Sequence, residues 1–226
     1  MKLLEKTKSL FILILNLFFP IKCIGCDKKD ELLCNECFSK VSPAERETER
    51  DIIAVFDYRD PIIKKAIWEL KYHHKKYLGE KLGQILYDSL IEEISELKKI
   101  ESYGQPILVI PVPISKKRNS MRGYNQAISI AQGFIKQTNK NILKVENDIV
   151  YRKIETSPQA KISNRAERLK NVRGIFDIKE KNKPLIRGRT CIVIDDVTTT
   201  GGTIAEIMKI LKKSGAKKVI GFAVAH

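Results

Sequence analysis

Several common nucleotide-binding signatures are missing from this chain. It has no Gly-x4-Gly-Lys-Ser/Thr segment, which excludes a Walker A loop. The Gly-x-Gly-x-x-Gly spacing of dinucleotide-binding proteins is also missing from its one Gly-Gly loop, at 201–202. No nucleophile or general base is evident, and no internal repeat or extended low-complexity tract occurs. These absences exclude the two best-known glycine-loop classes and a repeat architecture.

Long apolar runs are also missing. The longest stretch, Leu10–Leu15 followed by Leu17–Phe19, is shorter than the roughly 20 apolar residues that span a bilayer. It imitates a signal peptide, but Pro20 and Lys22 stand where small residues would mark a cleavage site. We therefore expect residues 1–19 to form an apolar helix that packs on the protein or on a partner, with membrane contact at most peripheral.

Acidic residues are too few to balance the basic ones. The 226 residues include 42 Lys and Arg against 27 Asp and Glu, a net charge of +15. This excess points to an anionic partner, either nucleic acid, phosphate metabolites or a membrane surface. A solvated basic surface produces the same composition, so charge alone does not separate these readings. The length and the 43% hydrophobic content suit one sizeable α/β domain with a small appendage.

Four of the five cysteines form two close pairs, Cys23 with Cys26 and Cys34 with Cys37. Without a cleaved secretory signal, such pairs favour metal binding in a reducing compartment, which predicts a cytoplasmic protein. Two Cys-x2-Cys knuckles can surround Zn²⁺ tetrahedrally, and four thiolates leave no open position for catalysis. We expect a structural zinc module over 20–42. Unliganded thiols and a disulfide remain the alternatives.

One stretch organises the rest of the chain. Cys191–Ile194 predicts a buried strand that ends in Asp195 and Asp196, and Ile204–Lys213 predicts a helix. Ligands in open α/β sheets bind at the carboxyl ends of strands, and a glycine loop that opens a helix can hold a phosphate. The two carboxylates would instead accept hydrogen bonds from sugar hydroxyls, so the implied ligand is a phosphorylated ribose. The residues expected to hold the phosphate are Thr198, Thr199, Thr200, Gly201, Gly202 and Thr203.

Strands and helices alternate over the expected main domain, 51–226, which predicts a parallel, doubly wound sheet. The expected strands are 52–58, 107–113, 149–151, 174–178, 191–194 and 218–224, and the expected helices are 62–77, 79–97, 127–137 and 204–213. A linker at 42–51, a basic loop at 114–126 and a polar excursion at 152–171 separate them. We expect Cys191 to be buried and His226 to be free. We expect Trp68 and Tyr72 to be packing residues, with a base-stacking surface for DNA, shared with Tyr77 and Tyr124, as the alternative.

The segment 191–203 resembles the ribose-5-phosphate signature of type I phosphoribosyltransferases. Further motifs resemble the ComF family of competence proteins, in the same order along nearly the whole chain. They are the two cysteine pairs, Pro111-Val112-Pro113, Arg122-Gly123-Tyr124-Asn125-Gln126, Gln159, Arg168 with Asn171, and Phe176. The resemblance implies a type I phosphoribosyltransferase fold behind a zinc-binding module. It also implies a role in natural transformation, with single-stranded DNA and the DNA-uptake machinery as partners.

Phosphoribosyl pyrophosphate with Mg²⁺ is the ligand that this resemblance implies, and the motifs do not settle whether any transfer is catalysed. Mg²⁺ and cationic side chains usually stabilise a departing pyrophosphate. The basic loop supplies Lys116, Lys117, Arg118 and Arg122 for this, and Arg165 and Arg168 lie in the excursion, which could act as a hood. We expect the catalytic residues to be Asp195, Asp196, Arg122 and Arg168, with Lys116 and Lys117 among the ligand-binding residues.

Three functions are compatible with these sequence features. The first is a DNA-uptake protein with a phosphoribosyl-pyrophosphate site. The second is a nucleotide-salvage phosphoribosyltransferase without a DNA role, and the third is a non-catalytic ligand sensor on the same fold.

Overall fold

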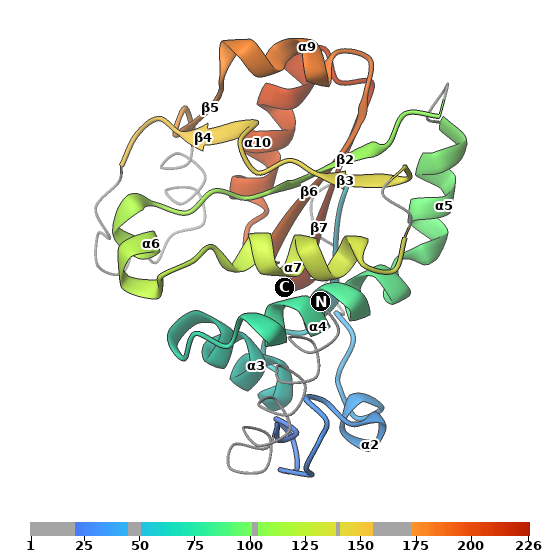
Figure 1. Cartoon of the computed structure of the whole chain (residues 1–226), viewed down its shortest axis with the longest axis vertical. Coiled ribbons are helices and arrows are strands. Elements are labelled where there is room, and N and C mark those ends of the chain that lie inside the picture. Colours follow the sequence, from blue (N-terminus) through green and yellow to red (C-terminus); the bar gives the residue numbers. More distant parts are fainter. Residues whose placement is uncertain (1–20, 45–50, 101–103, 139–140, 156–172) are drawn as a thin grey trace, which may run out of the picture. The chain divides into compact units, whose positions relative to one another are not determined.

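Five parallel strands form the central sheet of the larger part of the chain (Figure 1). In spatial order they are β1 (Ile52–Phe56), β7 (Lys218–Ala225), β6 (Thr190–Val197), β2 (Ile107–Pro111) and β3 (Leu143–Val145). Every neighbouring pair runs parallel. The first five residues of β6 are buried, as expected for a strand that is covered on both faces. The parallel α/β sheet predicted from the sequence is confirmed.

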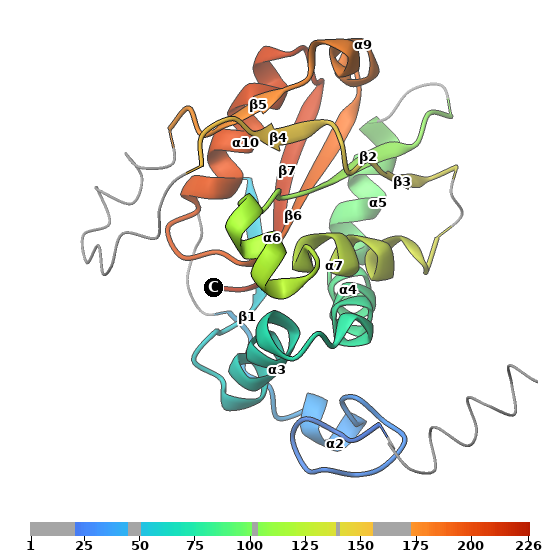
Figure 2. The ribbon, with the colours of Figure 1, turned by 60° about the vertical axis from the view of Figure 1, so that its left-hand side comes forward.

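Helices cover both faces of this sheet (Figures 1 and 2). Phe222 of β7 packs against Phe134 of α7 (Gln126–Ile135), with ring centroids 6.0 Å apart. The neighbouring Gly221 faces the other way, because a Cβ there would lie 2.3 Å from the side chain of Ile204 in α10 (Gly202–Lys213). Successive residues of a strand point to opposite faces, so α7 and α10 lie on opposite sides of the sheet.

Two glycines permit α4 (Lys76–Ser89) and α7 to approach closely. A Cβ on Gly83 would lie 2.0 Å from the carbonyl oxygen of Ile130, and a Cβ on Gly133 would lie 1.9 Å from that of Glu80. Neither position has room for a side chain, so the contact between these helices depends on glycine.

The helices between β1 and β2 in the chain are shorter than the sequence pattern predicts. The expected helix 62–77 ends early, because α3 (Pro61–Tyr72) stops before His74, which has a left-handed φ of 54°. The expected helix 79–97 is divided into α4 and α5 (Ile91–Ile100). Apolar periodicity continues across both breaks, which is why it does not reveal them.

A helix also occupies part of the expected basic loop at 114–126. This helix, α6 (Lys116–Arg122), begins where the Ser115 hydroxyl accepts a hydrogen bond from the Arg118 N–H at 3.2 Å. It ends at Gly123, which has a φ of 68°. The prediction of a loop over the whole of 114–126 was therefore wrong. The helix has no buried residues and so no apolar periodicity to reveal it, and only the residues at its two ends indicate it.

Two short strands lie outside the main sheet. β4 (Val150–Arg152) and β5 (Phe176–Ile178) form an antiparallel pair, and η1 (Glu180–Asn182) and α9 (Lys183–Ile186) follow. β3, with only three residues, was not predicted.

The computed structural model describes residues 21–44, 51–100, 104–138, 141–155 and 173–226. The chain divides into one unit of residues 1–41 and a second of residues 42–226. In the first unit, Lys22 and Lys29 form an isolated bridge and α2 (Asn35–Phe38) follows. The expected apolar helix 1–19 lies outside the described residues. No helix within the ranges just given combines the length and the apolar content needed to cross a membrane.

Candidate functional site

A cleft of about 590 Å³ lies at the carboxyl ends of β2 and β6. These strands are neighbours, yet the chain leaves β2 toward β3 on one side and continues from β6 to β7 on the other. Connections that diverge in this way open a crevice at the sheet edge, where α/β proteins bind ligands. The residues just after β2, Val112 to Ile114, and those ending β6, Asp195 to Val197, border the cleft.

Two adjacent carboxylates end β6. Asp196 is buried and lies opposite Lys71 of α3, whose Nζ is 3.1 Å from its Oδ2. Asp195 accepts a hydrogen bond from the Asp196 N–H at 2.8 Å. Burial and the neighbouring Asp196 carboxylate raise the pKa of Asp195 to about 8. Asp195 is therefore largely protonated at neutral pH in the ligand-free protein, and Lys71 faces the neighbouring Asp196 carboxylate.

The Thr/Gly loop connects this dyad to α10. Gly201 has a φ of 75° and immediately precedes the helix, so the loop directs the helix N-terminus toward the cleft. Thr199 and Thr203 line the cleft, whereas the buried Thr198 is held by a hydrogen bond from its N–H to the Ala225 carbonyl at 2.9 Å. Thr200 accepts a hydrogen bond from the Gly202 N–H at 3.4 Å. The expected loop and helix are thus present, with two of the four threonines lining the cleft.

The expectation that His226 is free was wrong. Its Nε2 lies 2.9 Å from the carbonyl oxygen of Thr199, within hydrogen-bond distance. Its main chain also bonds to the end of β1 and the turn that follows. The His226 N–H donates to the Phe56 carbonyl, and the His226 carbonyl accepts from the Tyr58 N–H. His226 therefore ties the phosphate loop to the end of β1.

The Arg-Gly-Tyr-Asn-Gln motif forms the turn between α6 and α7. Arg122 donates from Nη1 to the Gln126 side chain at 2.9 Å. Tyr124 is buried and donates from its hydroxyl to the Leu70 carbonyl of α3. Asn125 begins α7 by accepting a hydrogen bond from the Ala127 N–H and also donates to the Val112 carbonyl. The motif therefore connects the helix that carries Arg122 to both β2 and α3.

Three guanidinium groups line the cleft, namely those of Arg118, Arg122 and Arg152. Burial and the nearby Arg118 charge lower the pKa of Arg152, which lies 5.3 Å over the Phe176 ring. Arg152 was not among the predicted site residues. Arg152 directly follows the strand predicted at 149–151. That position at the carboxyl end of a strand was the one sequence signal that it could line a ligand site.

Two other predicted cations do not line the cleft. Lys116 and Lys117 are exposed on α6, and the Lys116 N–H donates to the Glu155 carboxylate at 3.1 Å. Arg165 and Arg168 lie outside the described residues.

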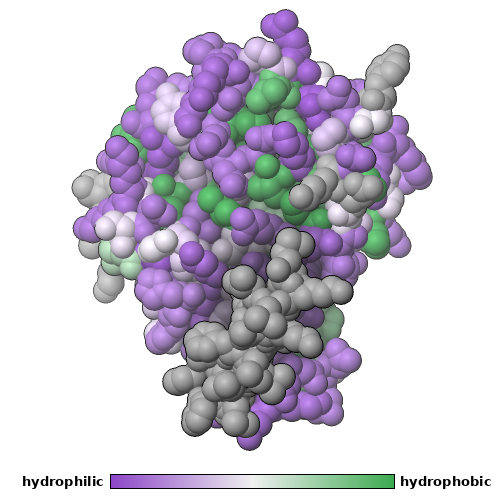
Figure 3. Space-filling model, in the orientation of Figure 1, coloured by the Kyte–Doolittle hydropathy of each residue, from purple (hydrophilic) through white to green (hydrophobic). Residues whose placement is uncertain are grey.

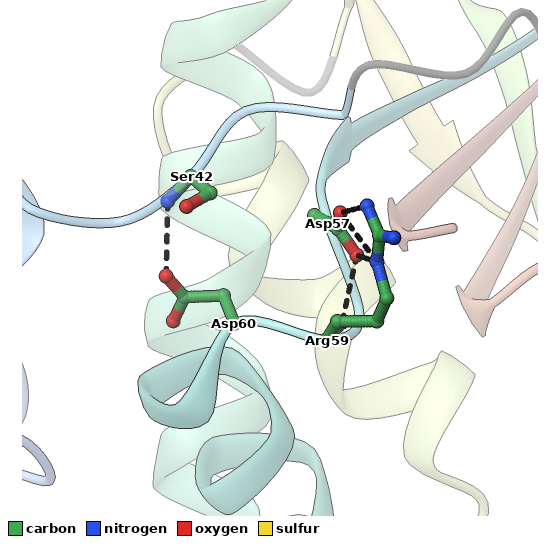
Figure 4. Close-up of polar contacts among 4 residues, drawn as sticks. All are labelled: Ser42, Asp57, Arg59 and Asp60. Atoms are coloured by element: carbon green, nitrogen blue, oxygen red, sulfur yellow. Dashed lines mark hydrogen bonds and ion pairs between the residues drawn. The ribbon is translucent and has the colours of Figure 1, made fainter.

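The turn after β1 supports another wall (Figure 4). Asp57 accepts hydrogen bonds from the backbone N–H and the guanidinium of Arg59, while Asp60 accepts one from the Ser42 N–H at 3.0 Å. Asp60 also accepts from the N–H groups of Ile62 and Ile63 and so begins α3. Tyr58, between these anchored residues, lines the cleft. The turn therefore sets the direction of the helix that carries Lys71.

The aromatic residues of α3 do not pack in the core. Trp68 and Tyr72 are 50% and 55% exposed, and both line the cleft. The prediction that they are packing residues was wrong, because their face of α3 turns toward the cleft. Tyr124, by contrast, is only 8% exposed, so its ring is not available for stacking.

The four paired cysteines come together in the first unit. Their Sγ atoms all lie within 4.8 Å of one another, and Cys34 is 3.6 Å from Cys23 and 3.7 Å from Cys26. These separations are too long for disulfide bonds, which measure about 2.05 Å. Cys191 is buried in β6, as predicted.

A larger cavity of about 740 Å³ lies elsewhere, between α9 and the end of α10. Its walls mix acidic residues such as Glu180 with basic ones such as Arg187, and none of the predicted site residues reaches it. The smaller cleft is therefore the one in which the predicted carboxylates, threonines and arginines come together.

The family profile described as Phosphoribosyl transferase domain matches residues 125–226. The matched segment contains β6, its Thr/Gly loop and α10, whereas Arg118, Arg122 and Tyr72 precede it.

Three curated proteins are similar over most of the chain. The "DNA utilization protein YhgH" of Escherichia coli O6:H1 is 27% identical over 188 residues, covering 83% of this chain and 75% of that protein. The "Competence protein F" of Haemophilus influenzae is 27% identical over 214 residues and 90% of each chain. The "Competence protein ComFC" of Streptococcus pneumoniae is 30% identical over 151 residues, covering 67% of this chain and 60% of that protein.

Proposed function

Because the chain belongs to the ComF family, we propose that it binds phosphoribosyl pyrophosphate in the cleft between β2 and β6 and acts in DNA uptake. One observation carries the binding proposal. Two carboxylates and a Thr/Gly loop at the end of β6 share a cleft with three guanidinium groups. A ligand that fits needs sugar hydroxyls in its middle and a phosphate group on either side of them.

The sugar and its 5′-phosphate belong to the β6 side. Asp195 and Asp196 accept hydrogen bonds from the ribose hydroxyls, in place of the contact that Asp196 makes with Lys71. The 5′-phosphate meets backbone N–H groups at the start of α10 and the hydroxyls of Thr199 and Thr203. Both contributions come from one continuous segment, which fixes the distance between them.

The pyrophosphate belongs to the side that carries Arg118, Arg122 and Arg152. These side chains neutralise its charge and hold it in line with the ribose. Mg²⁺, bound together with the ligand, supplies further neutralisation of the pyrophosphate. Burial and, after it, the nearby Arg118 charge lower the pKa of Arg152, so an anion bound beside these guanidiniums would stabilise the charged form of Arg152.

The cysteine cluster holds a structural Zn²⁺ in this proposal. A tetrahedron with Zn–S distances of about 2.3 Å has S–S edges of about 3.8 Å. The separations of 3.6 and 3.7 Å from Cys34 to its two neighbours fit such a tetrahedron. All four ligands are thiolates, so the ion stabilises the module and leaves no position for substrate. Reduced thiols of this kind suit the cytoplasm.

The DNA role is supported by the similarity to a DNA utilization protein and to competence proteins, and by the charge of +15. Figure 3 shows a mostly hydrophilic surface on the face that it draws, with hydrophobic side chains in scattered groups. We propose that single-stranded DNA binds through its phosphates, with counterion release. Lys71 and Lys75 are paired with Asp196 and Glu69, which leaves the exposed cations of α6 as the better contact.

Calorimetry on the full chain tests the ligand assignment directly. Ribose 5-phosphate, pyrophosphate and phosphoribosyl pyrophosphate are titrated separately, each with Mg²⁺. The proposal expects all three to bind and the intact ligand to bind most tightly, because it spans both sides of the cleft. Failure of the intact ligand to bind would exclude the assignment, and turnover against a panel of bases then separates an enzyme from a sensor.

Deletion of the coding sequence in a transformable host tests the DNA role. Transformation should fall while growth without added purines stays normal. Normal transformation with impaired growth would favour the salvage function.

A further inference from the structure

Two exposed aromatic rings stand in the polar cleft beside the carboxylates. Trp68 and Tyr72 are one helical turn apart on α3, with ring centroids 5.9 Å apart and planes inclined at 48°. Both line the same cleft as Asp195, Asp196 and Thr199. Rings of this size usually bury most of their area, so two half-exposed ones on one face provide apolar surface for a ligand.

The structure fixes these rings relative to the carboxylates. Lys71, which immediately precedes Tyr72, contacts Asp196 at 3.1 Å and so joins α3 to the end of β6. The Arg122 guanidinium lies 5.5 Å over the Tyr72 ring, which supports that ring from the α6 side. Asp60 begins the helix, and the Tyr124 hydroxyl bonds to its last turn at Leu70. The rings therefore stand on an element that is anchored at both ends.

We propose that Trp68 and Tyr72 form a stacking wall for the base of a nucleoside 5′-phosphate. This inference rests on the proposed function, because the β6 side of the cleft then holds the ribose and phosphate of the same molecule. A planar base is the chemical group that gains most from two aromatic faces in an otherwise polar, cationic cleft. The volume of about 590 Å³ lies within the range of about 300–1,000 Å³ typical of small-molecule sites.

The wall selects for planarity and not for one particular base. Two side-chain amides, Asn125 and Gln126, line the cleft, and both ends of each are engaged within the protein. Gln126 Oε1 accepts from Arg122 and its Nε2 donates to the Tyr124 carbonyl, while Asn125 Oδ1 accepts from the Ala127 N–H and its Nδ2 donates to the Val112 carbonyl. Among the described residues, stacking is therefore the main recognition available. Purine and pyrimidine nucleotides should both bind, with purines favoured by their larger ring area.

A base of this kind could belong to a free nucleotide or to a DNA strand. The carboxylate pair favours the free ribonucleotide, because its two ribose hydroxyls match two acceptors, whereas a deoxyribose within a strand offers no hydroxyl pair. The experiment therefore compares nucleoside 5′-monophosphates, ribose 5-phosphate and a short single-stranded oligonucleotide.

Trp68 is the one tryptophan of the chain, so its fluorescence reports directly on the proposed wall. The full chain is titrated with AMP, GMP, CMP and UMP, and each should quench the emission. Ribose 5-phosphate, which lacks a base, should displace a bound nucleotide and restore the emission. Calorimetry supplies the affinities where the fluorophore is removed.

Replacing either ring tests the wall without disturbing the core, since both side chains are exposed. Trp68→Leu and Tyr72→Leu should each weaken nucleotide binding on the order of tenfold and leave ribose 5-phosphate binding within twofold of wild type. Trp68→Phe and Tyr72→Phe should retain most of the affinity. Tyr77→Leu is the matched control, because Tyr77 is 43% exposed and does not line the cleft.

The outcomes separate this inference from the function on which it rests. Ribose 5-phosphate binding with no loss of nucleotide affinity in the Leu variants would overturn the wall and leave the proposed function standing. Quenching by the oligonucleotide but by none of the nucleotides would overturn the free-nucleotide assignment. No binding of any ribose phosphate would instead contradict the proposed function itself.

Discussion

Lys71 Nζ lies 3.1 Å from the Asp196 carboxylate and so joins α3 to β6, the strand that ends at the proposed sugar site. Both side chains are mostly withdrawn from solvent, with exposures of 19% and 12%. The pair therefore lies between a surface ion pair, worth about 0–1 kcal/mol, and a buried one, whose disruption costs about 3–5 kcal/mol.

Lys71→Met should lower the free energy of unfolding by about 1–3 kcal/mol, because it leaves the Asp196 charge without its partner. Asp196→Asn should remove most of that effect when the two substitutions are combined. Urea denaturation of both single variants and the double variant measures the coupling. Lys64→Met, at an exposed position of the same helix, is the control, and strictly additive effects of Lys71→Met and Asp196→Asn would show that the pair contributes nothing.

The raised pKa of Asp195 should make the ligand-free protein less stable as the pH rises. With a pKa of about 8 in the folded state and 3.8 as the ordinary value, the folded state binds more protons than the unfolded state between these limits. The stability that this carboxyl contributes is therefore complete below about pH 4 and is lost as pH rises through about 8. Asp196, Lys71 and Arg118 are the charged groups that act on it.

Asp195→Asn removes this titration, since an amide stays neutral throughout. Between pH 5 and pH 8, the free energy of unfolding should fall less in the variant than in the wild type. Equal pH slopes in the two proteins would contradict the assigned pKa.

Protein purified under reducing conditions should contain close to one zinc per chain. Cys34→Ser should lose the metal, because Cys34 Sγ lies within 3.7 Å of both Cys23 and Cys26 and a hydroxyl replaces the thiolate poorly. Elemental analysis measures the content, and Cys191→Ala should retain it. A metal-free wild type with a folded first unit would refute the zinc assignment.

Single-stranded DNA binding should depend on α6 more than on the lysines after α3. Lys116→Gln with Lys117→Gln should reduce the slope of log affinity against log salt by about 1.4, at about 0.7 per lost phosphate contact. Lys75→Gln should change it little, because Lys75 already pairs with Glu69 at 2.7 Å. Fluorescence anisotropy with a labelled oligonucleotide measures the slope, and a loss confined to Lys75→Gln would reverse the assignment of the surface.

Local sequence signals predicted those parts of the site that are continuous in the chain. The strand, the Asp195–Asp196 pair, the Thr/Gly loop and α10 follow one another directly, so one motif indicates them all. The cysteine pairs are similarly local, with a few residues between partners.

Long-range contacts decided what the sequence could not indicate. Tyr124 is buried because it reaches Leu70, 54 positions earlier, and Arg152 lines the cleft because β4 pairs with the distant β5. Trp68 and Tyr72 have packing-like helical spacing, yet their side of α3 turns toward the cleft. His226 meets Thr199 only because β7 and β6 are adjacent in the sheet.

The most direct test of the central claim is the affinity of phosphoribosyl pyrophosphate for wild type and for the Asp195→Ala plus Asp196→Ala variant. Loss of two hydroxyl contacts to these acceptors should weaken binding on the order of tenfold or more, at about 0.5–1.5 kcal/mol for each hydrogen bond. A thermal melt of the variant checks that it is folded. Calorimetry with Mg²⁺ present should show this loss, whereas equal affinity in the folded double variant would contradict the placement of the ribose at the end of β6.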